Sequence, residues 1–244
     1  SLNWTQLSAG FASVRHKALQ ITKLSEGYFD PTVLPLIKLW GFAGNSPSVP
    51  TKEKRSHVLS NIGMQHLELD GQRIRKLIPA IGIDLSAIAK GYAVDQIHDL
   101  IIAKGYPNVM VEIGGEVRAS GSNSKRAPWQ IAVRKPDTSR ISAETVIELS
   151  GQAMATSGDY ENYFEYQGRR YSHVIDPHTG YPPNNDIASV TVIANDCITA
   201  DALATTLMLT NSKLAEEILI ASNAQAILLK RLGSDFDIIR LPAN

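Results

Sequence analysis

Two oxygen-bearing side chains, Asp201 and Thr205, stand four residues apart in a segment that is predicted to be helical. Positions i and i+4 share one face of a helix, so a carboxylate and a hydroxyl can converge on one ion there. Such oxygens suit a hard cation such as Mg²⁺, which usually keeps several waters and shares phosphate oxygens. The alternative is an acidic residue that favours the first turn of a helix electrostatically, beside an ordinary helical threonine.

Lys90 lies in the segment Asp84-Leu-Ser-Ala-Ile-Ala-Lys90-Gly91, in the first turn of an expected helix. A cation there opposes the helix dipole at a cost of about 0.3–1 kcal/mol. An anion at the helix N-terminus, typically a phosphate, would reverse that balance. The alternatives are a solvated lysine or a local pair with Asp84. The spacing of a Walker phosphate loop is missing.

A third candidate is the run Glu112-Ile-Gly114-Gly115-Glu116, in which paired glycines interrupt a strand pattern. Glycines at such places often mark the close approach of a ligand or of another backbone, although a plain bulge would give the same pattern.

His173 comes near the end of an expected strand, just before the turn that Asp176 and Pro177 begin. Histidine is the commonest general base near neutral pH. A hydrogen-bonded structural histidine is the alternative. His178 follows five residues later, but no third His or Cys joins the two at a spacing typical of metal sites.

The elements that must position these residues mix helices and strands. Apolar residues at steps of three and four predict a helix that carries Trp4, Leu7, Phe11, Val14, Ala18 and Ile21. A second helix is expected from an N-cap at Ser86 to a stop at Gly105. Further expected elements are short helical pieces in 33–42, a polar helix in 51–61, helices at 199–209 and 213–222, and strands at 109–113, 130–134, 145–149, 162–166, 169–175, 190–194, 226–230 and 237–241.

The expected strands outnumber the helices and do not alternate regularly with them. The sequence therefore predicts an α+β fold with mixed or antiparallel sheets and packed helices. Because no linker or repeat interrupts the pattern, we expect one domain over residues 1–244.

Composition excludes several classes of partner. Lys plus Arg and Asp plus Glu each number 24, so the formal net charge is zero and no nucleic acid or anionic membrane is expected as partner. The single cysteine, Cys197, rules out an internal disulfide. We find no apolar run of bilayer length. The chain opens within a polar, helix-like segment, so we expect any leader to have been removed.

The candidate segments, taken in order, resemble the ApbE family of flavin transferases. The resemblance runs from about Phe11 to about Leu229 and is carried by YFDPTVLPLIKLWGF, IDLSAIAKGYAVD, VEIGGEVRASG, ATSGDYENYF, YSHVIDPHTGYP and ADALAT. Any one motif could arise by chance, but six in register make a specific match.

The resemblance implies an ApbE-like, T-fold-related fold and Mg²⁺-dependent transfer of FMN from FAD to a Thr or Ser hydroxyl of a target protein. It implies FAD contacts at Asp84, Lys90, Tyr28, Phe29 and Asp30. The metal ligands it implies are Asp201, Thr205 and the main-chain carbonyl of Ala87, and the base it implies is His173. It further implies a periplasmic lipoprotein at the outer face of the bacterial inner membrane.

One departure is that family members carry a further N-terminal portion ahead of the segment that begins here, with an opening strand and additional flavin or adenine contacts. Two alternative functions stay open. The first is an FAD pyrophosphatase that releases FMN and AMP, and the second is a non-catalytic flavin-binding or carrier protein.

Overall fold

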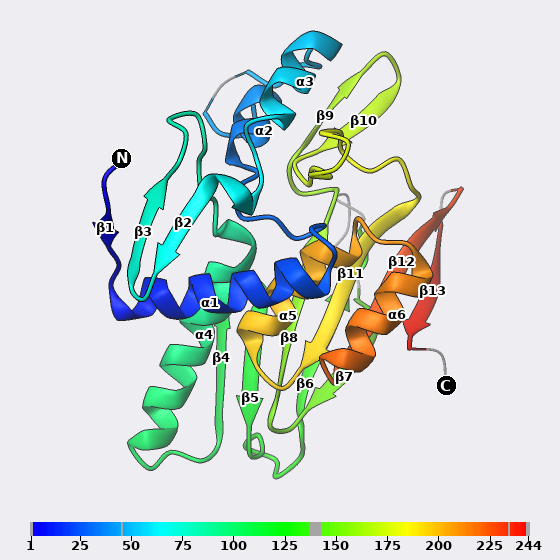
Figure 1. Cartoon of the computed structure of the whole chain (residues 1–244). Coiled ribbons are helices and arrows are strands. Elements are labelled where there is room, and N and C mark those ends of the chain that lie inside the picture. The colour runs from blue at the N-terminus through cyan, green and yellow to red at the C-terminus, as the bar shows by residue number, and fades with distance from the viewer. Residues whose placement is uncertain (1, 45, 137–142, 234, 243–244) are drawn as a thin grey trace. The chain divides into compact units, whose positions relative to one another are not determined.

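The computed structural model describes residues 2–44, 46–136, 143–233 and 235–242. Two compact units make up the chain (Figure 1). The first unit comprises Ser1–Leu85 and Glu161–Asn184, and the second comprises Ser86–Tyr160 and Asn185–Asn244. The single domain expected over residues 1–244 stays a prediction, because two compact units can belong to one domain.

The first unit begins with a small sheet and a long helix. Helix α1 (Ala9–Leu24) starts after Ser8, whose hydroxyl accepts a hydrogen bond from the Phe11 N–H. The predicted helix reached back to Trp4, which is wrong. Strand β1 (Thr5–Gln6) instead pairs antiparallel with β3 (Arg73–Lys76), which also pairs with β2 (Leu67–Asp70). The 3-10 helix η1 (Met64–His66) precedes β2. The apolar spacing was read correctly, but the Ser8 cap ends its helical part.

An aromatic core holds the rest of the first unit together. It joins α2 (Leu34–Leu39), the chain after α3 (Lys52–Leu59) and the hairpin of β9 (Tyr163–Tyr166) and β10 (Arg169–Ser172). Its fully buried centre is Trp40, whose indole N–H donates to the Gly180 carbonyl at 2.9 Å. The other buried members are Leu36, Ile62, Tyr171 and Ile175. This core anchors the turn that follows His173.

The second unit is built on a six-stranded antiparallel sheet of order β13-β12-β11-β8-β5-β4. Its strands are β4 (Val109–Ile113), β5 (Glu116–Ser120), β8 (Gln152–Gly158), β11 (Ile187–Ala194), β12 (Gln225–Leu232) and β13 (Asp235–Leu241). Every strand pair in it is antiparallel, so the predicted α+β class is confirmed.

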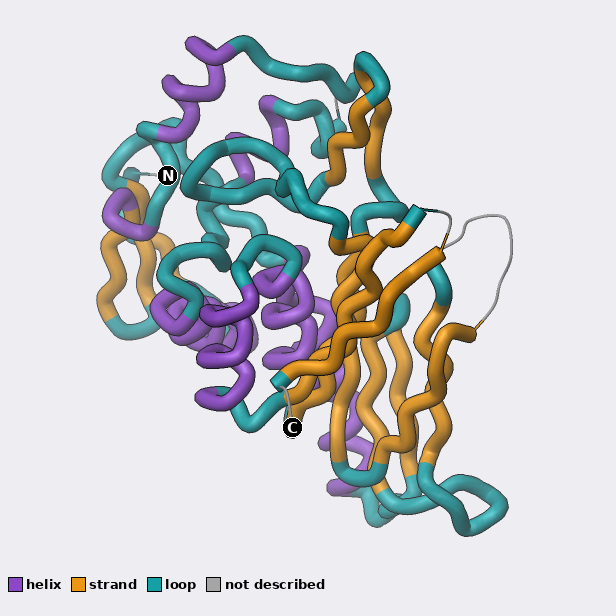
Figure 2. The backbone as a smooth tube through the Cα atoms, turned by 90° about the vertical axis from the view of Figure 1, so that its right-hand side faces the viewer, coloured by secondary structure: helices purple, strands orange, loops and turns teal. Residues whose placement is uncertain are grey.

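Helices cover one face of this sheet and a hairpin covers the other. Helices α4 (Ser86–Ala103) and α5 (Cys197–Leu207) pack on β4, β5 and β8 through Val94, Val111, Ala153 and Cys197. Helix α6 (Ser212–Ala221) packs on β12 and β13. On the opposite face, β6 (Trp129–Arg134) and β7 (Ala143–Leu149) pair with each other. Their residues Val133 and Leu149 pack in one apolar cluster with Met154 of the sheet. In Figure 2 the strands of this sheet run side by side as one layer.

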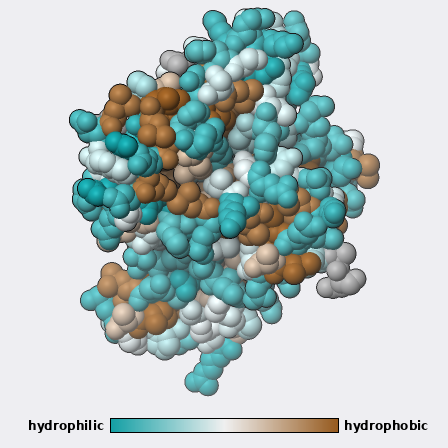
Figure 3. All heavy atoms as spheres, viewed as in Figure 1, coloured by the Kyte–Doolittle hydropathy of each residue, from teal (hydrophilic) through white to brown (hydrophobic). Residues whose placement is uncertain are grey.

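The helices of the described residues are all too short or too polar to cross a membrane. On the face drawn in Figure 3, hydrophobic residues form separate patches between hydrophilic ones.

Candidate active site

The contact between α4 and α5 brings Asp201 into the second unit's interior, where the residue is 3% exposed. Its Oδ2 accepts the backbone N–H of Gly91 at 2.9 Å. Gly91 allows this approach, because a Cβ there would lie 2.8 Å from Asp201 Cβ and overlap the Cys197 carbonyl oxygen. Burial raises the pKa of Asp201, against the opposing effects of the Gly91 N–H and of Lys90. The carboxylate is therefore one that a bound cation would stabilise.

Two further oxygens belong to the same pair of helices. Thr205, one turn after Asp201 on α5, shares a hydrogen bond of 2.9 Å with the Ser157 hydroxyl of β8. A hydroxyl oxygen has two lone pairs, so this bond leaves it able to bind a cation. Ala87 lies four residues before Gly91, and a regular α-helix pairs its carbonyl with the Gly91 N–H. Since the Asp201 carboxylate accepts the Gly91 N–H, it competes with the Ala87 carbonyl for the N–H group with which that carbonyl would normally pair.

The chemistry of the predicted oxygen set is compatible with Mg²⁺. Among the described residues, no three His, Cys, Asp or Glu side chains gather closely enough to hold a metal ion. The predicted site instead has one buried carboxylate, one hydroxyl and one carbonyl. That set suits Mg²⁺, which commonly takes one or two carboxylates and completes its shell with water and phosphate.

Lys90 pairs with a residue that sequence reasoning had not chosen as its partner. Its Nζ forms an ion pair with Oε1 of Glu116, the first residue of β5. Glu116 is 1% exposed, and its Oε2 has no hydrogen-bond partner among the described residues. Burial raises the pKa of Glu116, and the Asp201 charge raises it further, while Lys90 lowers it.

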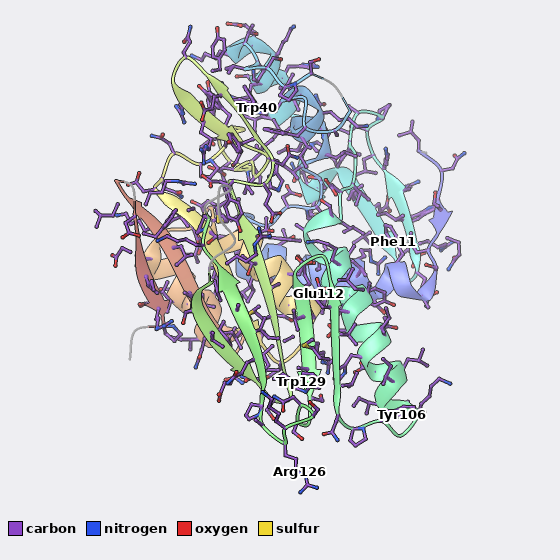
Figure 4. The ribbon with its side chains drawn as sticks, turned by 180° about the vertical axis from the view of Figure 1, so that it is seen from behind. Phe11, Trp40, Tyr106, Glu112, Arg126 and Trp129 are labelled. Atoms are coloured by element: carbon purple, nitrogen blue, oxygen red, sulfur yellow. The ribbon has the colours of Figure 1, made fainter. Side chains whose placement is uncertain are left out.

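The paired glycines form the turn between β4 and β5, with φ of 61° at Gly114 and 101° at Gly115. The Gly115 N–H donates to Glu112 Oε1 at 2.7 Å, and Figure 4 labels Glu112 beside this turn. A Cβ at Gly114 would make only ordinary contacts, at 3.7 Å from Glu116 Oε2 and Lys90 Cδ, so it is the positive φ that favours glycine there. The predicted interruption of the strand is thus a turn that places Glu116.

His173, the predicted base, follows β10 in the first unit. Its Nδ1 lies 3.1 Å from the Asn162 carbonyl oxygen, and its backbone N–H donates to the same oxygen at 3.0 Å. A carbonyl only accepts, so Nδ1 carries a proton and the neutral ring keeps its lone pair on Nε2. This is the tautomer that a general base needs.

The turn after His173 engages Asp176 on both oxygens. Oδ1 accepts the His178 N–H at 2.8 Å, and Oδ2 accepts the Thr179 hydroxyl at 3.0 Å. The His178 ring lies against Tyr28, with ring centroids 4.5 Å apart. Asp176 therefore holds the turn together through both of its oxygens.

The remaining predicted residues lie in the first unit. Asp30 Oδ1 accepts both the backbone N–H and the hydroxyl of Thr32, at 2.8 and 2.7 Å, and burial raises the Asp30 pKa. Phe29 is buried, and its N–H donates to the Ser25 hydroxyl. The Asp84 N–H donates to the Pro31 carbonyl at 2.7 Å, which joins the segments of Asp30 and Asp84.

Of the predicted site residues, Ala87, Lys90, Asp201 and Thr205 belong to the second unit, and Tyr28, Phe29, Asp30, Asp84 and His173 belong to the first. A hollow in the first unit is lined by Pro31, Ile83 and Leu85, among other residues. Pro31 follows Asp30 in the sequence, and Ile83 and Leu85 flank Asp84. Arg15, which also lines it, has a buried Nε without a hydrogen-bond partner among the described residues.

A family model described as "ApbE family" matches residues 1–228. The chain belongs to the ApbE family. A Vibrio cholerae relative named "FAD:protein FMN transferase" is 42% identical over 226 residues, which cover 92% of this chain and 68% of the relative. A Haemophilus influenzae relative of the same name is 40% identical over 238 residues, covering 95% of this chain and 69% of the relative.

Solved structures also share the fold of this chain. One described as "Flavin Transferase ApbE from Vibrio cholerae" matches with a TM-score of 0.87 and 39% identity, covering 98% of this chain and 77% of that one. The predicted ApbE-like fold is confirmed at this level of identity.

Sequence reasoning about this ApbE chain gave no role to two acids that are buried, Asp95 and Glu116. Asp95 of α4 accepts the N–H groups of Cys197 and Ile198, each at 2.9 Å, and an Arg118 N–H at 2.9 Å. It therefore caps the start of α5, the helix that carries Asp201. The available signal was that both acids lie within the motifs that carry the resemblance.

Proposed function

We propose that this ApbE-family chain transfers FMN from FAD to a Thr or Ser hydroxyl of a target protein in a Mg²⁺-dependent reaction. The acceptor oxygen forms a new bond to the FMN phosphorus, the pyrophosphate P–O bond breaks, and AMP leaves with the bonding electrons. Support comes from the ApbE relatives, which are named FAD:protein FMN transferases. The observation that carries the proposal is the buried Asp201 carboxylate, which the Gly91 N–H orients, one turn before Thr205 on α5.

The residues that would hold Mg²⁺ are Asp201, Thr205 and the Ala87 carbonyl. Bound there, the ion would supply positive charge to the pyrophosphate as negative charge develops on it. The protein's own contribution is a carboxylate fixed in direction by the Gly91 N–H, so the ligand does not reorganise during the reaction.

Lys90 and Asp84 are proposed contacts for FAD, together with Tyr28, Phe29 and Asp30. Lys90 is the fifth residue of α4, just past its first turn, and its side chain is 46% exposed. Its ammonium can therefore meet a phosphate from solvent while it keeps its pair with Glu116. The support is stronger for Lys90 than for the buried Phe29, whose backbone serves the loop after α1.

His173 is proposed to take the proton of the acceptor hydroxyl as that oxygen attacks phosphorus. Nδ1 is committed to the Asn162 carbonyl, so Nε2 is the atom that receives the proton. A positioned base typically contributes about 10²–10⁴-fold to a rate.

The test combines protein, FAD, Mg²⁺ and a candidate acceptor, and follows covalent flavin fluorescence on the acceptor and release of AMP. Asp201→Ala should abolish both signals while the far-UV circular dichroism stays unchanged. Glu217→Gln is the matched control, because this α6 carboxylate is 59% exposed and pairs only with Lys213 at 3.9 Å among the described residues. Undiminished transfer by Asp201→Ala, or by wild type with a chelator, would refute the metal assignment.

The same assay separates the alternatives. Release of free FMN and AMP without labelling of the acceptor would identify an FAD pyrophosphatase, in which water replaces the hydroxyl. Binding of FAD that stays intact would identify a carrier.

We also propose a location at the outer face of the bacterial inner membrane, as a periplasmic lipoprotein. The proposal rests on the family resemblance alone. Fractionation of cells that express the full gene product would test it, and recovery of the product in the cytoplasm would contradict it.

A further inference from the structure

Glu116 is a buried acid for which the reaction above has no use. It begins β5 directly after the Gly114–Gly115 turn, and the residue is 1% exposed. A buried carboxylate is costly unless it is paired and fully hydrogen-bonded. Glu116 has only one such partner, the Lys90 ammonium, and its Oε2 has none among the described residues. A packed apolar side chain would stabilise this position better, so the acid calls for a functional explanation.

The partner of Glu116 stands next to the proposed metal site. Lys90 precedes Gly91, whose N–H holds Asp201. The charges of Lys90 and Asp201 act on one another, and Asp201 acts on Glu116 as a like charge. The Lys90 ammonium is therefore paired with Glu116 and lies close enough to Asp201 for the two charges to interact.

Without Glu116, the lysine would have an obvious second partner. A lysine side chain is a flexible stem with a point charge at its end, and this one is half exposed. It could turn to Asp201, a buried carboxylate on which its charge already acts, and an ammonium paired there would compete with a divalent cation for the same oxygens.

We propose that Glu116 is a positioning residue that holds the Lys90 ammonium against β5, so that Lys90 does not pair with Asp201 and Asp201 stays available to a divalent cation. The inference rests on the proposed function in taking Asp201 as the cation ligand. It predicts that Glu116 controls cation affinity only through Lys90.

The experiment measures Mn²⁺ binding to the FAD-free protein by electron paramagnetic resonance and calorimetry at pH 7.5, with Mn²⁺ as the spectroscopic probe. Glu116→Gln should weaken Mn²⁺ binding by about tenfold, which corresponds to about 1.4 kcal/mol. Lys90→Met should bind Mn²⁺ at least as tightly as wild type. The double variant Glu116→Gln/Lys90→Met should recover wild-type affinity or better, because the competing ammonium is gone.

The control is Glu68→Gln, which removes the acid of the Arg75 pair in the first unit and should leave Mn²⁺ affinity unchanged. If Glu116→Gln does not fold, as judged by its thermal melt, Glu116→Asp serves instead. The shorter aspartate side chain keeps the charge but holds Lys90 less closely. The Mn²⁺ affinity of Glu116→Asp should therefore lie between that of wild type and that expected for Glu116→Gln.

Two outcomes would overturn the inference. Wild-type Mn²⁺ affinity in Glu116→Gln, or in Glu116→Asp where that variant serves, would show that Lys90 does not compete for Asp201. Equal weakening in the single and double variants would show that Glu116 acts without Lys90. Asp201→Asn separates the two proposals. If it binds Mn²⁺ like wild type, the metal assignment itself is wrong. If it loses binding while Glu116→Gln keeps it, only the present inference fails.

Discussion

Hydrogen bonds within the protein orient the two residues with the largest proposed chemical roles. One oxygen of Asp201 accepts the Gly91 N–H, and one nitrogen of His173 faces the Asn162 carbonyl. For His173, the other ring nitrogen, Nε2, is the atom proposed to receive the proton. A group that is oriented in this way loses little entropy when a ligand arrives.

Asp30 gives a prediction about the pH dependence of stability. Both of its hydrogen bonds end on Oδ1, so Asp30→Asn can keep them while it removes the charge. Burial raises the pKa of Asp30 above its ordinary value of 3.8. The stability that this shift contributes is present below pH 3.8 and is lost as pH rises through the raised pKa. The melting temperature of Asp30→Asn, relative to wild type, should therefore rise between pH 3.8 and neutrality and then level off.

The measurement is a series of thermal melts from pH 4 to pH 7.5. The expected gain is a few degrees, since 1 kcal/mol shifts the melting temperature by about 2–4 °C in a chain of this size. Glu53→Gln is a useful contrast, because the pKa of this fully exposed acid is lowered and its trend should run the other way. If the melting temperature of Asp30→Asn, relative to that of wild type, falls as pH rises, the prediction is contradicted.

The sequence could predict which residues act together only where the two partners are close in sequence. The i, i+4 pair of Asp201 and Thr205 does share a face of α5. The partner of Lys90 could not be predicted, because Glu116 lies 26 residues away on a strand that only the tertiary fold brings beside α4. Asp84 had been the local alternative.

Elements were predictable where hydrophobic periodicity is strong. The prediction of 86–105 for a helix matches α4 (Ser86–Ala103), and Gly105 does adopt positive φ. Strand β8 was missed, because its sequence QAMATSG is made mostly of small residues that carry little strand signal. β2 and β3 were missed because each has only four residues and several charges. Strand β10 ends at Ser172, three residues before the predicted end at residue 175, because the turn of Asp176 begins soon after.

The close packing of α4 on α5 gives a prediction for Gly91→Ala. Alanine is about 1 kcal/mol more favourable than glycine inside a helix, so it would stabilise α4 if there were space. There is none, because the new Cβ would meet Asp201 Cβ at 2.8 Å and overlap the Cys197 carbonyl. We expect a net loss of about 1–3 kcal/mol in urea denaturation and weaker Mn²⁺ binding. Ala89→Ser, on the exposed side of α4, is the control, and a Gly91→Ala protein as stable as wild type would contradict the packing argument.

The start of α5 gives a second prediction at this scale. Asp95→Ala removes the acceptor of two helix N–H groups and of Arg118. Unsatisfied buried donors cost about 1–3 kcal/mol each, so stability should fall by at least about 2 kcal/mol. Chemical denaturation measures this loss, and Asp95→Asn should lose less because it retains one acceptor oxygen. Equal losses in the two variants would mean that the hydrogen bonds are not what Asp95 contributes.

At the scale of the whole molecule, the proposed roles are divided between the two units. The proposed cation ligands and Lys90 belong to the second unit, and the base and the other proposed FAD contacts belong to the first. Each unit has its own core, around Trp40 in the first and around the six-stranded sheet in the second. Sequence periodicity could not show this division, because the first unit is assembled from two separated stretches of chain.

This division predicts that cation binding and proton transfer can be lost separately. His173→Ala should lower the rate of FMN transfer at saturating FAD by about 10²–10⁴-fold, because the acceptor hydroxyl loses its base. Its Mn²⁺ affinity should equal that of wild type, because the proposed ligands are in the other unit, and its FAD affinity should change little. Asp201→Ala should instead lose Mn²⁺ binding. His57→Ala, an exposed histidine of α3 in the same unit as His173, is the control for a general effect of removing an imidazole. If His173→Ala loses FAD binding yet transfers at a normal rate once saturated, His173 is a binding residue. The base must then be sought elsewhere, with Asp176 the first candidate, and that acid would have to give up one of its two hydrogen bonds in the turn to act.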